Sequence, residues 1–172
     1  MRLLRRFAPR NDMFNFMKRE AIIENIKVRS GKDLLESIDK SKNRAYFTIN
    51  KNILAQIARY LFNEEKARFS TASGVDTRKA VEILYHFSID EIGLIVTLRV
   101  ILNKPDIEKD SLKAGFQRGL EIDSLVPLMK CAEWIEMEMH EMLGVNFKGH
   151  PNLKHLLLKD DWPEGNYPLR RD

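Results

Sequence analysis

Three β-prone segments that follow one another closely constrain the fold of this chain more than any other feature. Residues 67–72, 80–88 and 93–102 are rich in β-branched and apolar side chains, and the third is the most apolar. The intervening Gly74-Val-Asp-Thr77 and Ser88-Ile-Asp-Glu-Ile92 are typical of turns. The three segments are therefore predicted to be neighbouring antiparallel strands.

Two helices are expected ahead of these strands. Residues 12–28 have apolar side chains at helical spacing behind Asn11 and Asp12, which can cap a helix start. The sequence Ser30-Gly-Lys-Asp33 resembles a capping box, with a carboxylate three residues after the hydroxyl. It predicts a short second helix that ends near Ser37.

A strand and a helix are expected next, over residues 45–49 and 53–61. The strand alternates in a β-prone manner, and Asn50 can cap the helix that follows it. Residues 103–123 are charged and contain Pro105 and two glycines, which indicates a surface loop.

The clearest helical pattern runs from Ser124 to Gly144. Pro127 falls in the first turn, where a missing N–H costs least, and Gly144 stands where helices commonly end. The apolar stripe of this helix consists of Leu125, Leu128, Met129, Ala132, Ile135, Met139 and Met142.

These patterns predict an α+β fold. We expect a small domain over residues 1–123, with a largely antiparallel sheet of about four strands covered by helices, and a C-terminal helix with an extended irregular tail over residues 124–172. At 172 residues and 44% hydrophobic, the chain should form one structural domain overall.

Composition excludes several classes of function. Cys131 is the only cysteine, so this chain alone can form neither an internal disulfide nor a cysteine-ligated iron–sulfur or zinc site. Lys and Arg outnumber Asp and Glu only by 29 to 25, and aromatic residues do not alternate with the basic ones, so nucleic-acid binding is not indicated. The apolar stretches fall short of the roughly eighteen residues of a membrane span, and the basic N-terminus lacks a secretory signal's apolar run. A cytoplasmic chain is expected.

Carboxylates and a histidine on the C-terminal helix raise the question of a metal site. Glu136 and His140 are four residues apart, whereas a helical di-iron pair needs a spacing of three, and the zinc motif His-Glu-x-x-His is missing. We therefore expect Glu133, Glu136, Glu138 and Glu141 to lie on a solvent-exposed helix face. An independent metal-dependent enzyme using these carboxylates stays open as an alternative.

Neither a histidine pair nor a nucleophile is predicted to be catalytic. His150 and His155 lie five residues apart across Pro151, which prevents a regular helix from holding both on one face. His150 is expected to donate a hydrogen bond that fixes a turn. The sequence also has no Gly-x-Ser-x-Gly elbow, phosphate-binding loop or dinucleotide-binding motif.

Residues 144–172, the C-terminal tail, combine turn residues with apolar anchors. The tail contains three of the eight glycines and three of the six prolines, yet it is too apolar and aromatic for a disordered segment. It can lie along another protein, with its aromatics in pockets and Arg170 and Arg171 paired with carboxylates. Alternatively, it folds back onto its own domain. Its anchors are Phe147, Leu153, residues 156–158, Trp162, Tyr167 and Leu169.

Residues 133–172 resemble the 30-kilodalton subunit family of respiratory complex I, the NADH dehydrogenase. This family also occurs in energy-converting membrane-bound nickel–iron hydrogenases and their sulfur-reducing relatives. The resemblance rests on Trp134-Ile-Glu-Met-Glu-Met-His-Glu-Met-Leu-Gly-Val145, Phe147-Lys-Gly-His-Pro-Asn-Leu153, Leu156-Leu-Leu158, Asp161-Trp162 and Tyr167-Pro-Leu-Arg-Arg-Asp172.

The resemblance implies a non-catalytic, cofactor-free structural subunit. It would pack against the large subunit related to the nickel–iron hydrogenase catalytic subunit, near the small iron–sulfur subunit, in the arm that projects into the cytoplasm. Iron–sulfur clusters, and a nickel–iron centre in some complexes, would belong to those partners. The chain would meet the cytoplasmic face of the membrane only through the complex.

The resemblance also implies a type of complex and an interface. The short, divergent sequence favours a ferredoxin-coupled hydrogenase or sulfur reductase, with an NADH- or F(420)H(2)-linked quinone oxidoreductase as the alternative. The chain has Met137 and Lys154-His155 where the family usually has arginines, which affects any bidentate contact made there. The expected interface residues are Glu138, Glu141, Phe147, His150, Pro151, Leu157, Trp162, Tyr167, Pro168, Arg170 and Arg171.

Overall fold

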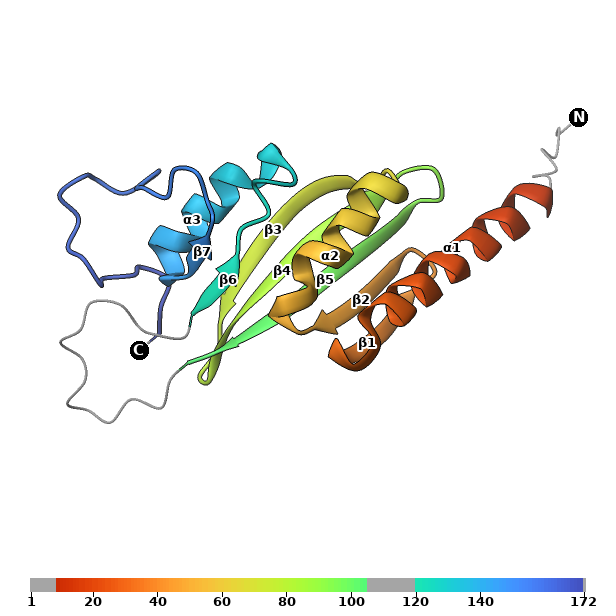
Figure 1. Ribbon diagram of the computed structural model, residues 1–172, viewed down its shortest axis with the longest axis horizontal. Coiled ribbons are helices and arrows are strands. Elements are labelled where there is room, and N and C mark those ends of the chain that lie inside the picture. Colours follow the sequence, from red (N-terminus) through yellow and green to blue (C-terminus); the bar gives the residue numbers. More distant parts are fainter. Residues whose placement is uncertain (1–8, 105–119, 172) are drawn as a thin grey trace, which may run out of the picture.

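The computed structural model describes residues 9–104 and 120–171 and has two layers, helices on one side and a five-stranded sheet on the other (Figure 1). Helix α1 (Pro9–Ser30) leads through a 3₁₀ turn, η1 (Gly31–Asp33), into the sheet. The sheet strands are β1 (Leu34–Ser41), β2 (Arg44–Ile49), β3 (Arg68–Asp76), β4 (Ala80–Ile89) and β5 (Leu94–Asn103).

The remaining elements join or follow the strands. A 3₁₀ turn, η2 (Lys51–Ile53), helix α2 (Leu54–Arg59) and a π turn, η3 (Tyr60–Glu64), connect β2 to β3. After the sheet come β6 (Glu121–Asp123), the 3₁₀ turn η4 (Lys130–Ala132), α3 (Glu133–Leu143) and β7 (Asn146–Lys148).

The sheet order is β1-β2-β5-β4-β3, and only the β2–β5 pair is parallel. Phe47, Leu98 and Tyr85 lie side by side on neighbouring strands and are fully buried under the helices. At the β3 edge, a Cβ added to Gly74 would lie 2.2 Å from Leu143 Cδ1, so α3 packs closely on this strand. The sheet thus carries α3 at one edge.

The predicted fold class is confirmed. The four expected strands appear as β2, β3, β4 and β5. Asn50 caps the next turn by accepting a hydrogen bond from the Asn52 N–H at 3.1 Å. Helix α3 ends at Gly144, which adopts the left-handed conformation with φ +70°.

The predicted helix near residues 30–37 is wrong. Gly31 has φ +49°, which ends α1 after Ser30, and the Ser30 side chain makes no capping bond. The chain then forms β1 at the sheet edge. Seven of its eight side chains are exposed, which explains why no alternating apolar pattern marks it. The first helix is also longer than predicted, since it begins at Pro9.

The predicted helix over residues 124–144 begins nine residues late, at Glu133. Met129 is extended, with φ −146° and ψ 106°, so the turn around Pro127 does not continue into α3. The predicted loop over 103–123 is wrong at Glu121–Asp123, which form β6; residues 105–119 lie outside the described residues. β6 pairs with β7. This pairing links residues 121–123, at the end of the expected first region, to the C-terminal region expected from residue 124.

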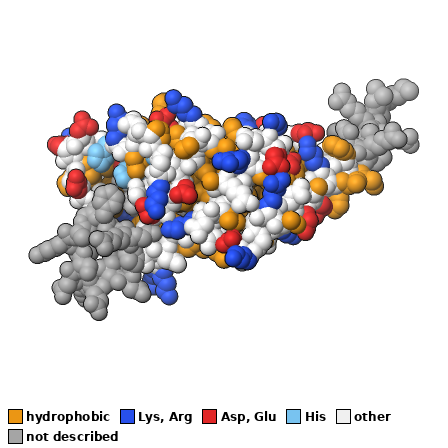
Figure 2. Space-filling view, in the orientation of Figure 1, with side chains coloured by type: hydrophobic (Ala, Val, Ile, Leu, Met, Phe, Trp, Pro, Cys, Tyr) orange, Lys and Arg blue, Asp and Glu red, His pale blue; other side chains and the backbone are white. Residues whose placement is uncertain are grey.

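Charges of both signs are interspersed over the face shown in Figure 2, and hydrophobic side chains gather toward the projecting end of α1. Four of these, Met13, Phe14, Phe16 and Met17, are each more than half exposed. Across residues 9–104 and 120–171, no helix combines the length and apolarity needed to cross a membrane.

Candidate partner-binding surface

Glu136 of α3 holds the irregular segment that precedes its helix. Its fully buried carboxylate accepts hydrogen bonds from Ser124 Oγ at 2.6 Å, the Leu125 N–H at 2.9 Å and the Tyr85 hydroxyl at 3.2 Å. Burial raises the pKa of Glu136 despite these three bonds, which favour the ionised form. The carboxylate therefore ties residues 124 and 125 to α3 and β4.

Glu141 holds the tail in the same manner. Its carboxylate accepts hydrogen bonds from three successive backbone N–H groups, those of residues 156, 157 and 158, at 2.9, 2.9 and 3.2 Å. His155 Nδ1 lies 3.5 Å away. Burial raises the pKa of Glu141, but the N–H donors and His155 outweigh it and hold this pKa below its usual value.

The prediction of a solvent-exposed acidic face is wrong for these two residues. Glu136 and Glu141 are 0% and 2% exposed, while Glu133 and Glu138 are half-buried. Helical spacing placed the carboxylates off the apolar stripe. In the fold, however, hydrogen-bond donors of other segments surround Glu136 and Glu141. Buried carboxylates are stable where hydrogen-bond donors replace water.

The end of the tail docks on α3 and β3. The Leu169 N–H donates to Met142 O at 3.0 Å, and Arg170 Nη1 donates to Leu143 O at 3.2 Å. The Arg171 N–H donates to Asp76 Oδ2 at 2.8 Å. The tail therefore folds back onto its own domain, as the second of the two sequence-based interpretations expects.

Other predicted interface residues also have contacts within the chain. Phe147 is buried in β7, and the Tyr167 ring lies so close to Gly144 that an added Cβ would be 2.5 Å from it. Trp162 Nε1 donates to Asn166 O at 2.8 Å. These side chains shape the tail, and their contribution to an interface stays a prediction.

His150 fixes a turn, but it accepts the turn's hydrogen bond and does not donate it, whereas the sequence had suggested a donor. Its Nδ1 accepts from the Asn152 N–H at 3.2 Å, so Nε2 carries the proton and donates to Glu133 O at 3.1 Å. This bond joins the tail to the first turn of α3. Pro151 beside it is exposed.

Several predicted interface residues remain accessible. Pro151, Leu157, Pro168 and Arg171 are exposed, and Glu138 is half-buried. In the part of the chain that the structure describes, the Glu138 carboxylate has no hydrogen bond or ion pair. These residues can contact another protein without disturbing the fold.

Sequence reasoning missed the most exposed aromatic side chain near α3. Trp134 is 72% exposed, and Leu156, Leu157 and Leu169 are also exposed. Trp134 lies off the apolar stripe of its helix, and that position was a signal that its side chain faces solvent. Met137, at a position where an arginine was expected, is buried.

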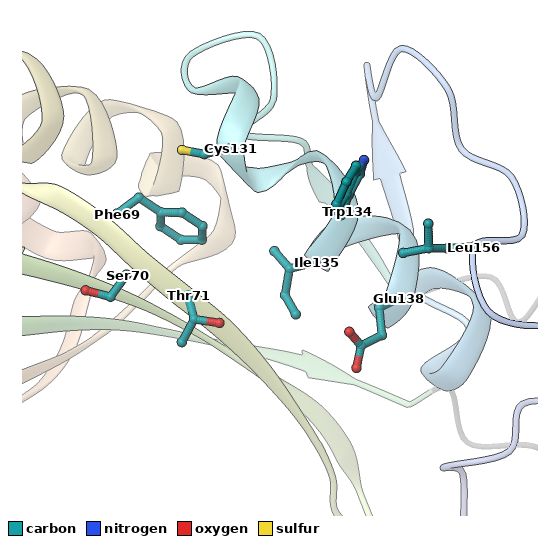
Figure 3. A pocket seen from close by; sticks show the side chains of 8 residues that line it. All are labelled: Phe69, Ser70, Thr71, Cys131, Trp134, Ile135, Glu138 and Leu156. Carbon is teal, nitrogen blue, oxygen red and sulfur yellow. The ribbon is translucent and has the colours of Figure 1, made fainter.

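A hollow of about 340 Å³ separates α3 from the end of β3 (Figure 3). We call it the α3 groove and define it by Phe69, Thr71, Trp134, Ile135, Glu138 and Leu156. Figure 3 shows Phe69 pointing from β3 toward α3, and Ile135 and Glu138 pointing from α3 toward β3. A second hollow, of about 350 Å³, lies beside Trp134 and includes Lys130, Cys131 and Glu133.

No metal site is formed by the described residues. Within the ranges 9–104 and 120–171, no three His, Cys, Asp or Glu side chains are arranged to hold an ion. The carboxylates of Glu136 and Glu141 bind different segments of their own chain. The accessible chemistry near α3 includes the exposed Trp134 ring and the carboxylates of Glu133 and Glu138, which are unpaired among the described residues, and it suits contact with a protein.

The α+β fold of this chain also occurs in a chain of a respiratory membrane complex. A chain in the structure of the membrane-bound sulfane sulfur reductase, an archaeal respiratory membrane complex, matches with a TM-score of 0.70. This match covers 89% of the present chain and 84% of that chain at 20% identity, so it shows the fold alone.

The family follows from the sequence comparison. Residues 47–172 match the family described as respiratory-chain NADH dehydrogenase, 30 Kd subunit, and the chain belongs to this family. The match begins inside β2 and includes β3 to β5, α3 and the entire tail.

Two relatives show the range of the family. A subunit of the F(420)H(2) dehydrogenase of Methanosarcina mazei is 30% identical over 91% of this chain and 92% of the relative. A subunit of the NADH-quinone oxidoreductase of Citrifermentans bemidjiense is 37% identical over 42% of this chain. The chain spans 44% of that second relative, less than half of its length.

Proposed function

We propose that this chain is a cofactor-free structural subunit in the peripheral electron-transfer arm of a membrane-bound, complex I-like ion-pumping complex. The observation that carries the proposal is the family match over residues 47–172, which includes α3 and its tail. The chain would pack against a large subunit related to nickel–iron hydrogenases, with a small iron–sulfur subunit nearby. Its role would be to bury surface of these two subunits and hold them in position.

The environment of the carboxylates supports a structural role. Glu136 and Glu141 are engaged by groups of their own chain, and the exposed side chains near them include the apolar Trp134, Leu156 and Leu157. Exposed aromatic and aliphatic side chains around a hollow are the usual anchors of a protein interface. The partner would cover this surface at the cytoplasmic face of the membrane.

We place the complex among the ferredoxin-coupled hydrogenases or sulfur reductases. The fold match to the sulfane sulfur reductase chain, over 89% of this chain, supports this type. The second candidate is a quinone oxidoreductase fed by NADH or F(420)H(2), and the nearly full-length similarity to the F(420)H(2) dehydrogenase chain favours it. Measuring which electron donor the purified complex oxidises separates the two.

Metal analysis and add-back test the proposal together. The isolated full-length chain should contain no stoichiometric transition metal and show no flavin or iron–sulfur absorbance. Membranes from a strain that lacks the chain should lose donor-linked electron transfer and regain it when the metal-free chain is added. A stoichiometric metal, or turnover by the isolated chain, would overturn the structural role in favour of an independent metal enzyme.

A further inference from the structure

The α3 groove has the shape and lining of a site for protein side chains. Its walls are apolar at Phe69, Trp134, Ile135 and Leu156, with the Thr71 hydroxyl on the β3 side. Small-molecule sites typically measure roughly 300–1,000 Å³, so a hollow of about 340 Å³ is small for a cofactor and suits one or two bulky side chains.

Trp134 is the exposed side chain that most strongly indicates a protein interface. At 72% exposure its indole is far more accessible than tryptophan side chains usually are, and it stands between the two hollows. Tryptophan is enriched among the residues that dominate binding energy when a partner surrounds them. The exposed Leu156 and Leu157 extend this apolar surface along the tail.

Charge limits the chemistry of the occupant. Among the described residues that line the α3 groove, none is Lys or Arg, and Glu138 is the only acidic one. Glu138 has no bond within the described ranges and points toward β3. A partner cation beside this half-buried carboxylate would gain a charge-assisted hydrogen bond.

The β3 wall favours an extended occupant. β3 is an edge strand of the five-stranded sheet, and its Ser70 and Thr71 line the groove at a register shift in the β3–β4 pairing. An extended segment can lie along such an edge and direct alternate side chains into a neighbouring hollow.

We propose that the α3 groove docks an extended segment of a partner subunit that places a large apolar side chain against Trp134, Phe69 and Ile135 and a lysine or arginine against Glu138. This inference rests on the proposed function, because the segment belongs to the same complex. It adds the location and the chemistry of one contact.

Alkylation of Cys131 tests the location. Cys131 is the only cysteine, is exposed and lies at the mouth of both hollows. N-ethylmaleimide should label the isolated chain readily, and labelling should slow by about tenfold or more in the purified complex. Equal labelling rates in the assembled complex would overturn the groove contact and leave the proposed function intact.

Charge reversal tests the chemistry. Glu138→Lys should lower recovery of the complex by about tenfold, Glu138→Gln should lower it less, and Trp134→Ala should lower it by a similar factor of about ten. Glu164→Lys is the matched control, because Glu164 is exposed in the tail away from the groove. Thermal unfolding of each isolated variant should stay close to that of the wild type, which confirms its fold.

The outcomes separate the two proposals. Folded Glu138→Lys and Trp134→Ala chains that assemble as well as Glu164→Lys would overturn the groove contact alone. A wild-type chain that assembles with no other subunit would overturn the proposed function and the groove contact together.

Discussion

At the residue scale, one helix holds two buried carboxylates with opposite pKa shifts. Glu136 accepts from one backbone N–H and two hydroxyls, and burial still raises its pKa. Glu141 accepts from three backbone N–H groups near His155, and these lower its pKa. At Glu136 burial therefore outweighs the three hydrogen bonds, whereas at Glu141 the three N–H donors together with His155 outweigh burial.

Removing the Glu136 carboxylate should lower the free energy of unfolding of the chain. Glu136→Ala leaves the Leu125 N–H and two hydroxyls without an acceptor in a buried site. We expect a loss of about 3 kcal/mol in the free energy of unfolding, measured with urea at pH 7. Glu138→Ala on the same helix should change it by less than about 0.5 kcal/mol. Equal losses would contradict the role given to Glu136.

The stabilisation that Glu141 provides should be lost in acid. Because its folded pKa is lowered, its stabilisation is present above the unfolded carboxyl pKa, near pH 4.3, and is lost as pH falls through the lower folded pKa. Glu141→Gln keeps one acceptor oxygen for three donors, so amide exchange at residues 156–158 should accelerate by about tenfold. Unchanged exchange there, compared with a Glu133→Gln control, would sink this assignment.

Residue-scale sequence reasoning succeeded where local backbone geometry decides the contact. The turn at His150, where Nδ1 accepts from the Asn152 N–H, followed from Gly149 and Pro151 beside it, and the Asn50 cap followed from its place before a helix. The burial of Glu136 and Glu141 could not be predicted. It depends on residues 124–125 and 156–158, which reach α3 only in the folded chain.

At the element scale, Gly144 joins α3 to the end of the tail. It ends the helix with φ +70°, and the Tyr167 ring covers the space where a side chain would begin. The glycine is needed for both its conformation and its size.

Two glycine variants separate these requirements. Gly149 also has a positive φ, +78°, but no atom lies within 4 Å of the position of its Cβ. Gly149→Ala should cost about 1 kcal/mol of backbone strain alone. Gly144→Ala should cost about 3 kcal/mol, because it also displaces the Tyr167 ring. Thermal unfolding compares the two, and equal destabilisation would contradict the packing of Tyr167 on Gly144.

Prediction of the elements succeeded where apolar residues mark a strand or a helix face in the sequence. It failed at the exposed edge of the sheet. β4 alternates in burial from Val81 to Ile89 and β5 is apolar along most of its length, so both patterns were visible. β1 has almost no buried side chains, and Gly31 rather than Ser30 determines where the preceding helix ends. The segment 124–132 kept an apolar period, yet Met129 is extended and the Leu125 N–H is bonded to Glu136, so the helix is not continuous.

At the whole-molecule scale, the tail is part of its own domain, as the second of the two sequence-based interpretations expected. Phe147 contributes to the hydrophobic core, and β7 pairs with β6. A truncation after Gly144 therefore removes core packing together with any interface, and loss of assembly in that variant would not identify a contact. Point variants on the exposed side chains, such as Trp134 and Leu157, address the interface directly.

Family membership was predictable from the sequence because the motif between Trp134 and Arg171 is long and its order is specific. The groove was not, because its two walls come from β3 and α3, which are about sixty residues apart and meet at Gly74.

The central claim, that this chain is a subunit of a larger respiratory assembly, is tested most directly by purifying the affinity-tagged full-length chain from detergent-solubilised membranes of its source. Mass identification should find a large subunit related to nickel–iron hydrogenases and a small iron–sulfur subunit in stoichiometric amounts. Recovery of the chain by itself, with both of those subunits left in a separate complex, would contradict the account.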